Sequence, residues 1–463
     1  MKKSSMNMTE GSIIKSMIGF AVPVLIGNIF QQMYNIVDTA IIGNVLGDDA
    51  LASIGAAAPV YALMINLTEG MTNGFAVVIA RFFGAGDKPA MRRAVSLTYI
   101  LSAMIAAVLT LISVITINPI LHLLKTPKDI IGGTSRYMTI ILMFLAVTIA
   151  YNMLAGMMRA IGNSRVPLYF LLVSTFANIG LDILFVKGLS LGVAGAAYAT
   201  VISQGISVVL CFVYCIKKCP ELIFGTKELV FDKVLLFELI NTGLAMGLME
   251  AIVYVGSVIM QGAVNAFGTA TIAAHTAARK IDDVFTLPIG TIAMATSTFA
   301  SQNYGAGKID RVKKGMRYGM LISFAWSAFA LIIVLLFHRL MIQGLTGTVD
   351  TEVINTASKY MCWNVPFLSV LGILLVLRNG LQGVGRKIVP ICGSIVELVL
   401  KIAAAAVLAP TLGYLGICIC EPLIWILSSV LVVWDYRIFI RQSKFKYKNE
   451  SISIQMTAGI SEQ

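Results

Sequence analysis

The stretch "FGAGDKPAMRR" at residues 83–93 is repeated as "YGAGKIDRVKK" at residues 304–314. In both copies a Gly-Ala-Gly turn follows a long apolar run and leads into basic residues, and the copies are 221 positions apart. "LGVAG" at residues 191–195 returns with the same offset as "LGYLG" at 412–416. "IGNSRVP", which ends at Pro167, matches "VGRKIVP", which ends at Pro390, with a gap of two further residues. These matches occur in the same order along the chain, so they indicate an internal duplication.

The composition is that of a membrane protein. Of the 463 residues, 58% are hydrophobic and only 13% are charged, whereas soluble domains carry about 25% charged residues. Apolar runs of roughly 20 to 28 residues recur along the chain, and about 20 helical residues cross the hydrocarbon layer. We therefore expect twelve spanning helices, near residues 13–42, 51–80, 94–121, 135–157, 166–187, 191–216, 235–262, 270–300, 315–337, 356–377, 388–409 and 413–436.

The duplication divides these spans equally between two halves. Six spans per repeat is an even number, so the two repeats have the same orientation in the membrane. The expected fold is an all-α polytopic membrane protein of twelve transmembrane helices, in two parallel-repeat six-helix lobes with a central cleft. The predicted divisions are an N-terminal lobe (1–216), a cytoplasmic linker (217–234), a C-terminal lobe (235–440) and a cytoplasmic tail (441–463).

The positive charge is distributed by topology. The net charge is +12, but 26 of the 35 Lys and Arg residues fall in alternate connections that include both ends of the chain, and only 6 fall in the others. Basic residues concentrate on the cytoplasmic side of membrane proteins. We therefore expect a multi-pass protein of the cell membrane with both termini in the cytoplasm, and no nucleic-acid partner.

One membrane span contains a carboxylate that needs an explanation. In "TFANIGLDILFVKG", residues 175–188, Asp182 lies within an apolar run, where an ionised group costs about 2.5 to 3.5 kcal/mol. Asn178 lies one helical turn earlier, Thr200 has a similar depth in the next span, and Asp38 occurs in the first span. Oxygen ligands suit hard cations, and two adjacent carboxylates need a proton or cation between them.

These four residues, Asp38, Asn178, Asp182 and Thr200, are therefore predicted to form a cation site in the N-terminal lobe. The bound ion would be the coupling ion, Na⁺ or H⁺, and we expect no other metal and no cofactor. The alternative is that Asp38 and Asp182 only make hydrogen bonds to neighbouring helices.

Other polar residues in the spans are candidates for a substrate cavity. They are Gln31, Gln32, Tyr34 and Asn35 near Asp38, Glu250 in "GLMEAIVYVG", and Asp282 and Asp283 in "HTAARKIDDVFTLP". Arg279 has the spacing to pair with Asp282 and Asp283, Lys280 to pair with Asp283, and Glu397 to pair with Lys401. Such clusters either neutralise themselves or belong to a substrate path, and the sequence leaves both open. For His275 the sequence favours a packed, hydrogen-bonded side chain.

Soluble catalytic motifs do not occur in the sequence. It contains no GxxxxGK[ST], HExxH or GxSxG motif. We therefore expect no enzyme and no ATP-binding cassette within the chain, so an ion gradient or a partner must supply the driving force.

The repeated loops, the twelve spans in two parallel sixes and the proline-containing first helix with its aspartate (Pro23, Asp38) resemble the multidrug and toxic compound extrusion (MATE) family over essentially the whole chain. The set Asn178, Asp182 and Thr200 is similar to the N-lobe cation site of the branch that contains DinF-type and multidrug efflux members, and Asp38 fits the aspartate that completes it.

The resemblance implies a membrane antiporter that exports cationic or amphiphilic small molecules by alternating access. It also implies an outward-facing V of two lobes and coupling through bending of the first helix. Another branch has an acid in the tenth span, but residues 360–377 contain no Asp or Glu, so a C-lobe cation site through Glu250 is not favoured. Its partners would be the bilayer and the exported molecule, and the chain would be a monomer.

The main alternative is a lipid-linked oligosaccharide or lipid flippase of the same superfamily. Such proteins often have a more cationic central cavity, which binds pyrophosphate. Here the spacing supplies acidic partners to Arg279 and Lys280, which favours the antiporter. A channel or a membrane enzyme would need a pore-lining polar helix or a catalytic cluster, and the sequence has neither.

Overall fold

The computed structural model describes residues 6–123, 126–225, 232–348 and 350–460, with side chains for all of these except residues 48 and 444–460. All regular secondary structure in these ranges is helical. Residues 226–231 of the predicted linker and residues 461–463 of the predicted tail lie outside the described residues.

The membrane spans agree with the expectation from the sequence. Among the described residues, eleven helices are long and apolar enough to cross a membrane. A twelfth crossing is formed by two helices, Lys128–Met143 and Leu145–Ala160, which meet at a bend of 47°. Each of the twelve predicted runs falls on one of these crossings, so the predicted all-α polytopic fold is confirmed.

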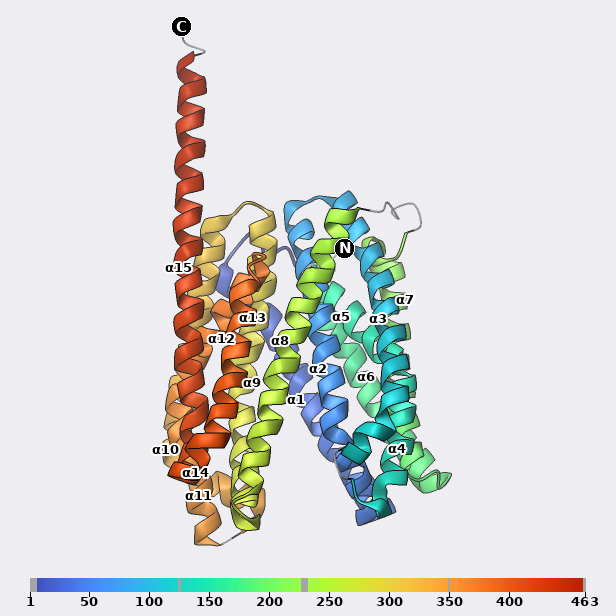
Figure 1. Ribbon diagram of the computed structural model, residues 1–463. Helices are drawn as coiled ribbons and strands as arrows, with labels where there is room; N and C mark the ends of the chain where they lie inside the picture. The colour runs from blue at the N-terminus through green and yellow to red at the C-terminus, as the bar shows by residue number, and fades with distance from the viewer. Residues whose placement is uncertain (1–5, 124–125, 226–231, 349, 461–463) are drawn as a thin grey trace. The chain divides into compact units, whose positions relative to one another are not determined.

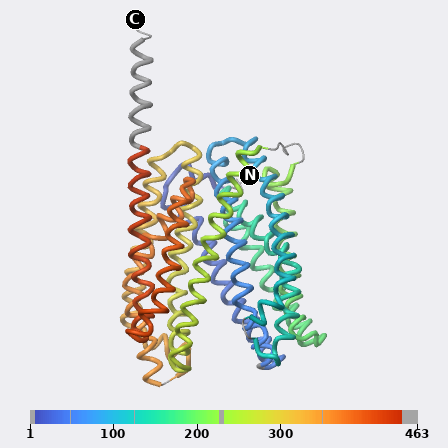
Figure 2. The backbone as a smooth tube through the Cα atoms, in the orientation of Figure 1, coloured from blue at the N-terminus to red at the C-terminus, as the bar shows by residue number. Residues whose placement is uncertain are grey.

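The chain divides into two compact units, residues 1–261 and 262–463. Within each unit the long helices run beside one another (Figures 1 and 2). The helices of the first unit are α1 (Ile13–Leu46), α2 (Asp48–Ala85), α3 (Lys88–Leu123), α4 (Lys128–Met143), α5 (Leu145–Ala160), α6 (Arg165–Asp182), α7 (Val193–Lys218) and most of α8 (Lys233–Asn265), with a 3₁₀ turn at Pro220–Leu222.

The helices of the second unit are α9 (Thr269–Gly305), α10 (Ile309–Thr346), α11 (Thr351–Asn364), α12 (Leu368–Gly383), α13 (Ile388–Ala403), α14 (Ala409–Leu412) and α15 (Tyr414–Ile460), with a 3₁₀ turn at Val365–Phe367.

The duplication is visible in the backbone. Glycines with positive φ occur in corresponding pairs: Gly47 and Gly268 (81° and 85°), Gly86 and Gly307 (73° and 71°), Gly162 and Gly385 (82° and 87°), and Gly192 and Gly413 (62° and 60°). Gly86 ends α2 in the left-handed conformation, which a residue without Cβ adopts at little cost. The same turns in both halves show that the two repeats share one backbone plan.

A π-helical turn follows the corresponding helix of each repeat. It is formed by Ile183–Gly188 after α6 and by Ala404–Leu408 after α13. Such turns are rare and occur frequently at functional sites. Asp182 is the last α-helical residue before the first of them.

Helix α8 packs closely on α2 within the first unit. A Cβ atom on Gly70 would lie 2.6 Å from the Met246 carbonyl oxygen, and one on Gly74 would lie 2.7 Å from that of Thr242. Leu235 and Leu239 join the buried cluster that contains Phe75, and further buried members of that cluster include Ile79, Met91 and Met158. These contacts explain why the first unit extends to residue 261.

We expect Gly74→Val to destabilise the protein, because the added side chain meets α8 backbone rather than a flexible side chain. Overpacking of this kind costs roughly 1 to 3 kcal/mol. The thermal unfolding midpoint of the detergent-purified protein measures the effect. Gly205→Ala on α7, where nothing lies within 4 Å of the new Cβ, serves as the control. Equal midpoints for the two variants would contradict the close approach of α2 and α8.

Candidate functional site

Asp182 and Asn178 bring two polar side chains into the interior of the first unit. Asp182 is 0% exposed and Asn178 is 1% exposed. With its amide nitrogen facing Asp182, Asn178 donates to Oδ2 at 2.7 Å and accepts from the backbone N–H of Thr200 at 3.2 Å. The amide therefore connects the end of α6 to α7.

Helix α1 adds two further groups from adjacent turns. Helix α1 packs along α6. The hydroxyl groups of Tyr34 and Thr200 are 3.5 Å apart, and Thr200 donates its own proton to the Ala196 carbonyl, so Tyr34 is the donor. One turn after Tyr34, the carboxyl group of Asp38 interacts directly with that of Asp182. The four residues that the sequence predicts to meet are thus brought together, and Tyr34 joins them.

The two carboxyl groups are incompletely satisfied. Oδ1 of Asp38 and Oδ1 of Asp182 are buried and have no hydrogen-bond partner. Within the described ranges, neither forms an ion pair with Lys, Arg or His. We name this set, Tyr34, Asp38, Asn178, Asp182 and Thr200, the acid pair cluster. It presents carboxylate, amide and hydroxyl oxygens with no fixed positive charge of its own.

Sequence reasoning missed further polar side chains close to the acid pair cluster. Tyr61 on α2 and Tyr137 on α4 lie near Asp38. Tyr61 contacts Gln204 on α7, and Gln204 accepts a hydrogen bond from Thr148 on α5 at 2.6 Å. Single tyrosines in apolar runs give no sequence signal, although Tyr137 could have been found through its repeat counterpart, Tyr360.

The other polar candidates for a substrate cavity are not part of the acid pair cluster. Gln31, Gln32 and Asn35 are exposed, and their side chains are not part of the hydrogen-bond network around Asp182. Glu250 is half-buried on α8. Their contribution to a substrate path stays a prediction.

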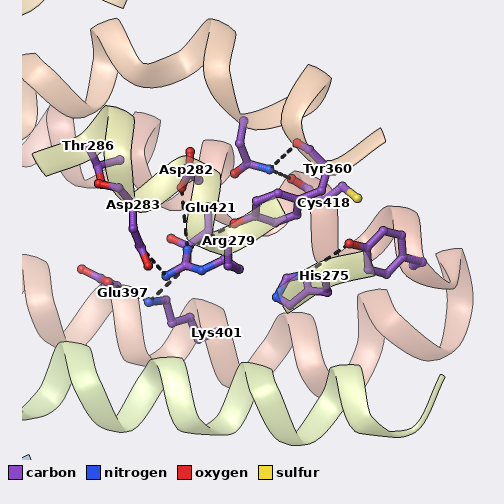
Figure 3. A network of polar contacts seen from close by, with 12 residues as sticks. His275, Arg279, Asp282, Asp283, Thr286, Tyr360, Glu397, Lys401, Cys418 and Glu421 are labelled. Atoms are coloured by element: carbon purple, nitrogen blue, oxygen red, sulfur yellow. Dashed lines mark hydrogen bonds and ion pairs between the residues drawn. The ribbon is translucent and has the colours of Figure 1, made fainter. Parts of the chain in front are cut away.

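A second polar cluster lies inside the second unit, and Figure 3 shows it. Arg279 on α9 lies 3.9 Å from oxygens of Asp282, Asp283 and Glu421 and donates to the Tyr360 hydroxyl at 3.2 Å. Lys401 on α13 lies 3.0 Å from Glu397 and 3.4 Å from Glu421 on α15.

Three pairings predicted from sequence spacing are confirmed: Arg279 with Asp282, Arg279 with Asp283, and Lys401 with Glu397. Lys280 is exposed, and its pairing with Asp283 stays a prediction. Glu421 was missed because it is distant from both cations in the sequence. Its carboxylate joins the two halves of this cluster, as Figure 3 shows. His275 is hydrogen-bonded to the Tyr414 hydroxyl at 3.1 Å and packs edge-on against Tyr360, as expected for a packed histidine.

We name this set, Arg279, Asp282, Asp283, Tyr360, Glu397, Lys401 and Glu421, the ion-pair cluster. Lys401 is 2% exposed, whereas the side chain of Asp283 is 62% exposed, so the cluster reaches from the interior to the surface of its unit. Its buried acids have cations supplied by the protein, in contrast to the acid pair cluster.

Comparisons with known proteins agree with this architecture. The family model for MatE matches residues 23–184 and 245–407, one segment in each repeat. The chain therefore belongs to the multidrug and toxic compound extrusion (MATE) family of transporters.

Similar proteins cover nearly the whole chain. The "probable multidrug resistance protein" YoeA of Bacillus subtilis is 27% identical over 94% of this chain and 96% of its own length. A transporter of the MOP superfamily from Pyrococcus furiosus is similar in structure, with a TM-score of 0.88 at 21% identity, covering 96% of this chain and 99% of that one. An outward-facing multidrug resistance MATE transporter has a TM-score of 0.87 at 21% identity, covering 94% and 98%.

We expect Asn178→Ala to lower the thermal unfolding midpoint, since it removes the donor to Asp182 and an acceptor for α7. A buried polar group left unsatisfied costs about 1 to 3 kcal/mol. Asn35→Ala on α1 is the matched control, because Asn35 is exposed and such changes usually stay within roughly 0.5 kcal/mol. An equal effect of the two substitutions would argue against the bond to Asp182.

Proposed function

We propose that this protein is a cation-coupled antiporter that exports cationic or amphiphilic small molecules by alternating access, with the coupling ion, H⁺ or Na⁺, bound at the acid pair cluster. The observation that carries the proposal is the direct contact between the carboxyl groups of Asp38, which is half-buried, and Asp182, which is fully buried, with no basic partner among the described residues. Two carboxylates in a low dielectric need a shared proton or a bound cation.

The ligand chemistry supports a small, hard cation. Carboxylate, amide and hydroxyl oxygens are the ligands that such ions prefer. The hydroxyls of Tyr34 and Thr200 and the amide of Asn178 surround the pair. A proton can be held between the carboxyl groups, and Na⁺ can take the two oxygens that lack partners.

The position of the acids supports coupling to movement. Asp38 belongs to α1 and Asp182 to α6, so ion binding changes the attraction between these two helices. Pro23 lies within α1, where it removes a backbone hydrogen bond and permits a bend. We infer that ion binding at the acid pair cluster favours one conformation of α1. Export then occurs because binding of the ion and binding of the substrate are mutually exclusive.

The energy available is sufficient for this exchange. Moving one charge through 100 mV supplies about 2.3 kcal/mol, which corresponds to more than a tenfold change in an equilibrium constant. The exported class rests on family membership and on relatives described as multidrug resistance proteins. The inner location of both termini rests on the Lys and Arg distribution.

The flippase alternative has less support. Recognition of a pyrophosphate group needs cations that are free to bind it. Arg279 and Lys401 are each engaged with carboxylates.

We expect Asp38→Asn and Asp182→Asn each to reduce gradient-driven export at least about tenfold, because each removes a charge that the coupling ion requires. Uptake of a fluorescent organic cation into inverted vesicles measures transport, with Na⁺ and pH gradients imposed separately to identify the ion. Asp129→Asn, at an exposed position of α4, is the control. Size-exclusion profiles check folding. Undiminished transport by both variants would falsify the assignment.

A further inference from the structure

The repeat relates the two polar clusters to each other residue by residue. The paired glycines give the sequence offset between equivalent positions of the two repeats. It is 221 residues for α2 and α9 and for α7 and α15, and 223 residues for α4 and α11 and for α6 and α13. The helix starts agree, since α4 and α6 begin at Lys128 and Arg165 and their partners at Thr351 and Ile388. The resulting pairs are Tyr61 with Asp282, Tyr137 with Tyr360, Asn178 with Lys401, and Thr200 with Glu421.

Burial confirms this alignment near the two clusters. In α6 the buried positions include Pro167, Ser174 and Asn178. In α13 they include Pro390, Glu397 and Lys401, the same three positions of the repeat. The clusters thus occupy the same place in two copies of one scaffold.

The chemistry at this place differs between the copies. In the first unit Asp182 contacts Asp38 and the amide of Asn178. In the second unit an alanine run, residues 403–406, follows at the level of Asp182. There the Asn178 position holds Lys401, whose ammonium group lies 3.0 Å from Glu397 and 3.4 Å from Glu421.

We propose that Lys401 is a fixed cation that takes, in the second unit, the place of the exchangeable cation of the acid pair cluster. Its four-carbon chain ties the ammonium group to α13, so this positive charge cannot leave during transport. Arg279 assists, since its guanidinium group lies 3.9 Å from Oε1 of Glu421, the same oxygen that Lys401 approaches. The inference rests on the proposed function and adds that only the first unit exchanges an ion.

The charges around Lys401 support this assignment. Glu397 on α13 and Glu421 on α15 pair with Lys401 directly. Arg279 on α9 shares Glu421 with it and pairs in turn with Asp282 and Asp283. Removing a buried cation leaves its carboxylates uncompensated, which is strongly destabilising. A free alkylammonium ion from solution, of the same shape as the side chain removed, should then bind at the vacated position and compensate these carboxylates.

Lys401→Ala in the full-length, detergent-purified protein tests this directly. The part of the side chain removed has the atoms of propylammonium. We expect the variant to unfold at a lower temperature than the parent in choline chloride, and propylammonium chloride at equal ionic strength to raise its midpoint by roughly 2 °C or more. The parent should not respond. Both proteins are measured in a background that combines Asp38→Asn with Asp182→Asn, so that the acid pair cluster offers no carboxylate to the added cation.

Absence of a response specific to Lys401→Ala overturns the proposal. If that variant does not fold, Lys401→Ala combined with Glu421→Gln removes the cation together with one of its acids. Recovery of folding, without a propylammonium response, supports the fixed-cation role. If the double variant also fails to fold, Lys401 is needed for its shape rather than its charge, and the fixed-cation proposal is wrong. Because the readout is stability, the result is independent of whether Asp182→Asn abolishes transport.

Discussion

A carboxylate inside a membrane protein must be compensated, and the rest of this structure depends on how that is done for Asp38 and Asp182. Their side chains meet between α1 and α6 with no basic residue beside them among the described residues. The surrounding groups are neutral and leave the charge of the pair uncompensated. Asn178 donates a hydrogen bond to Asp182, and Tyr34 donates one to Thr200. In the proposed function, a proton or cation from solution meets this charge deficit, and its binding is coupled to the conformation of α1.

The duplicated scaffold meets the same constraint in two ways. Both repeats keep the positive-φ glycines and the π-helical turn after the corresponding helix. In the first repeat, Asn178 places an amide next to the buried Asp182. In the second repeat, the equivalent position holds Lys401. A tethered ammonium group gives permanent compensation, whereas an amide leaves room for an ion that binds and leaves. We infer that divergence at this position made one half exchange an ion and the other hold its charge.

Much of this could be predicted from the sequence because the signals are local or repeated. The twelve apolar runs gave the spans, and the spacing of Asn178 and Asp182 placed them on one helix face. Glu421 was missed, since its partners Arg279 and Lys401 come from other helices and no local pattern connects them. The bend at Phe144 was also missed, because neither Pro nor Gly marks it. Gln31, Gln32 and Asn35 were proposed as substrate-cavity candidates from their proximity to Asp38 in sequence. They are exposed on α1, and their role in a substrate path stays a prediction.

The central claim is that the coupling ion binds to the carboxyl groups of Asp38 and Asp182. Infrared difference spectroscopy of the reconstituted protein tests it most directly, by exchanging Na⁺ for choline and an acidic for a neutral buffer over the same sample. The account predicts carboxyl and carboxylate bands that change with the coupling ion in the parent protein and vanish in the variant that combines Asp38→Asn with Asp182→Asn. Bands of undiminished amplitude in that variant would contradict it, because the ion would then bind elsewhere.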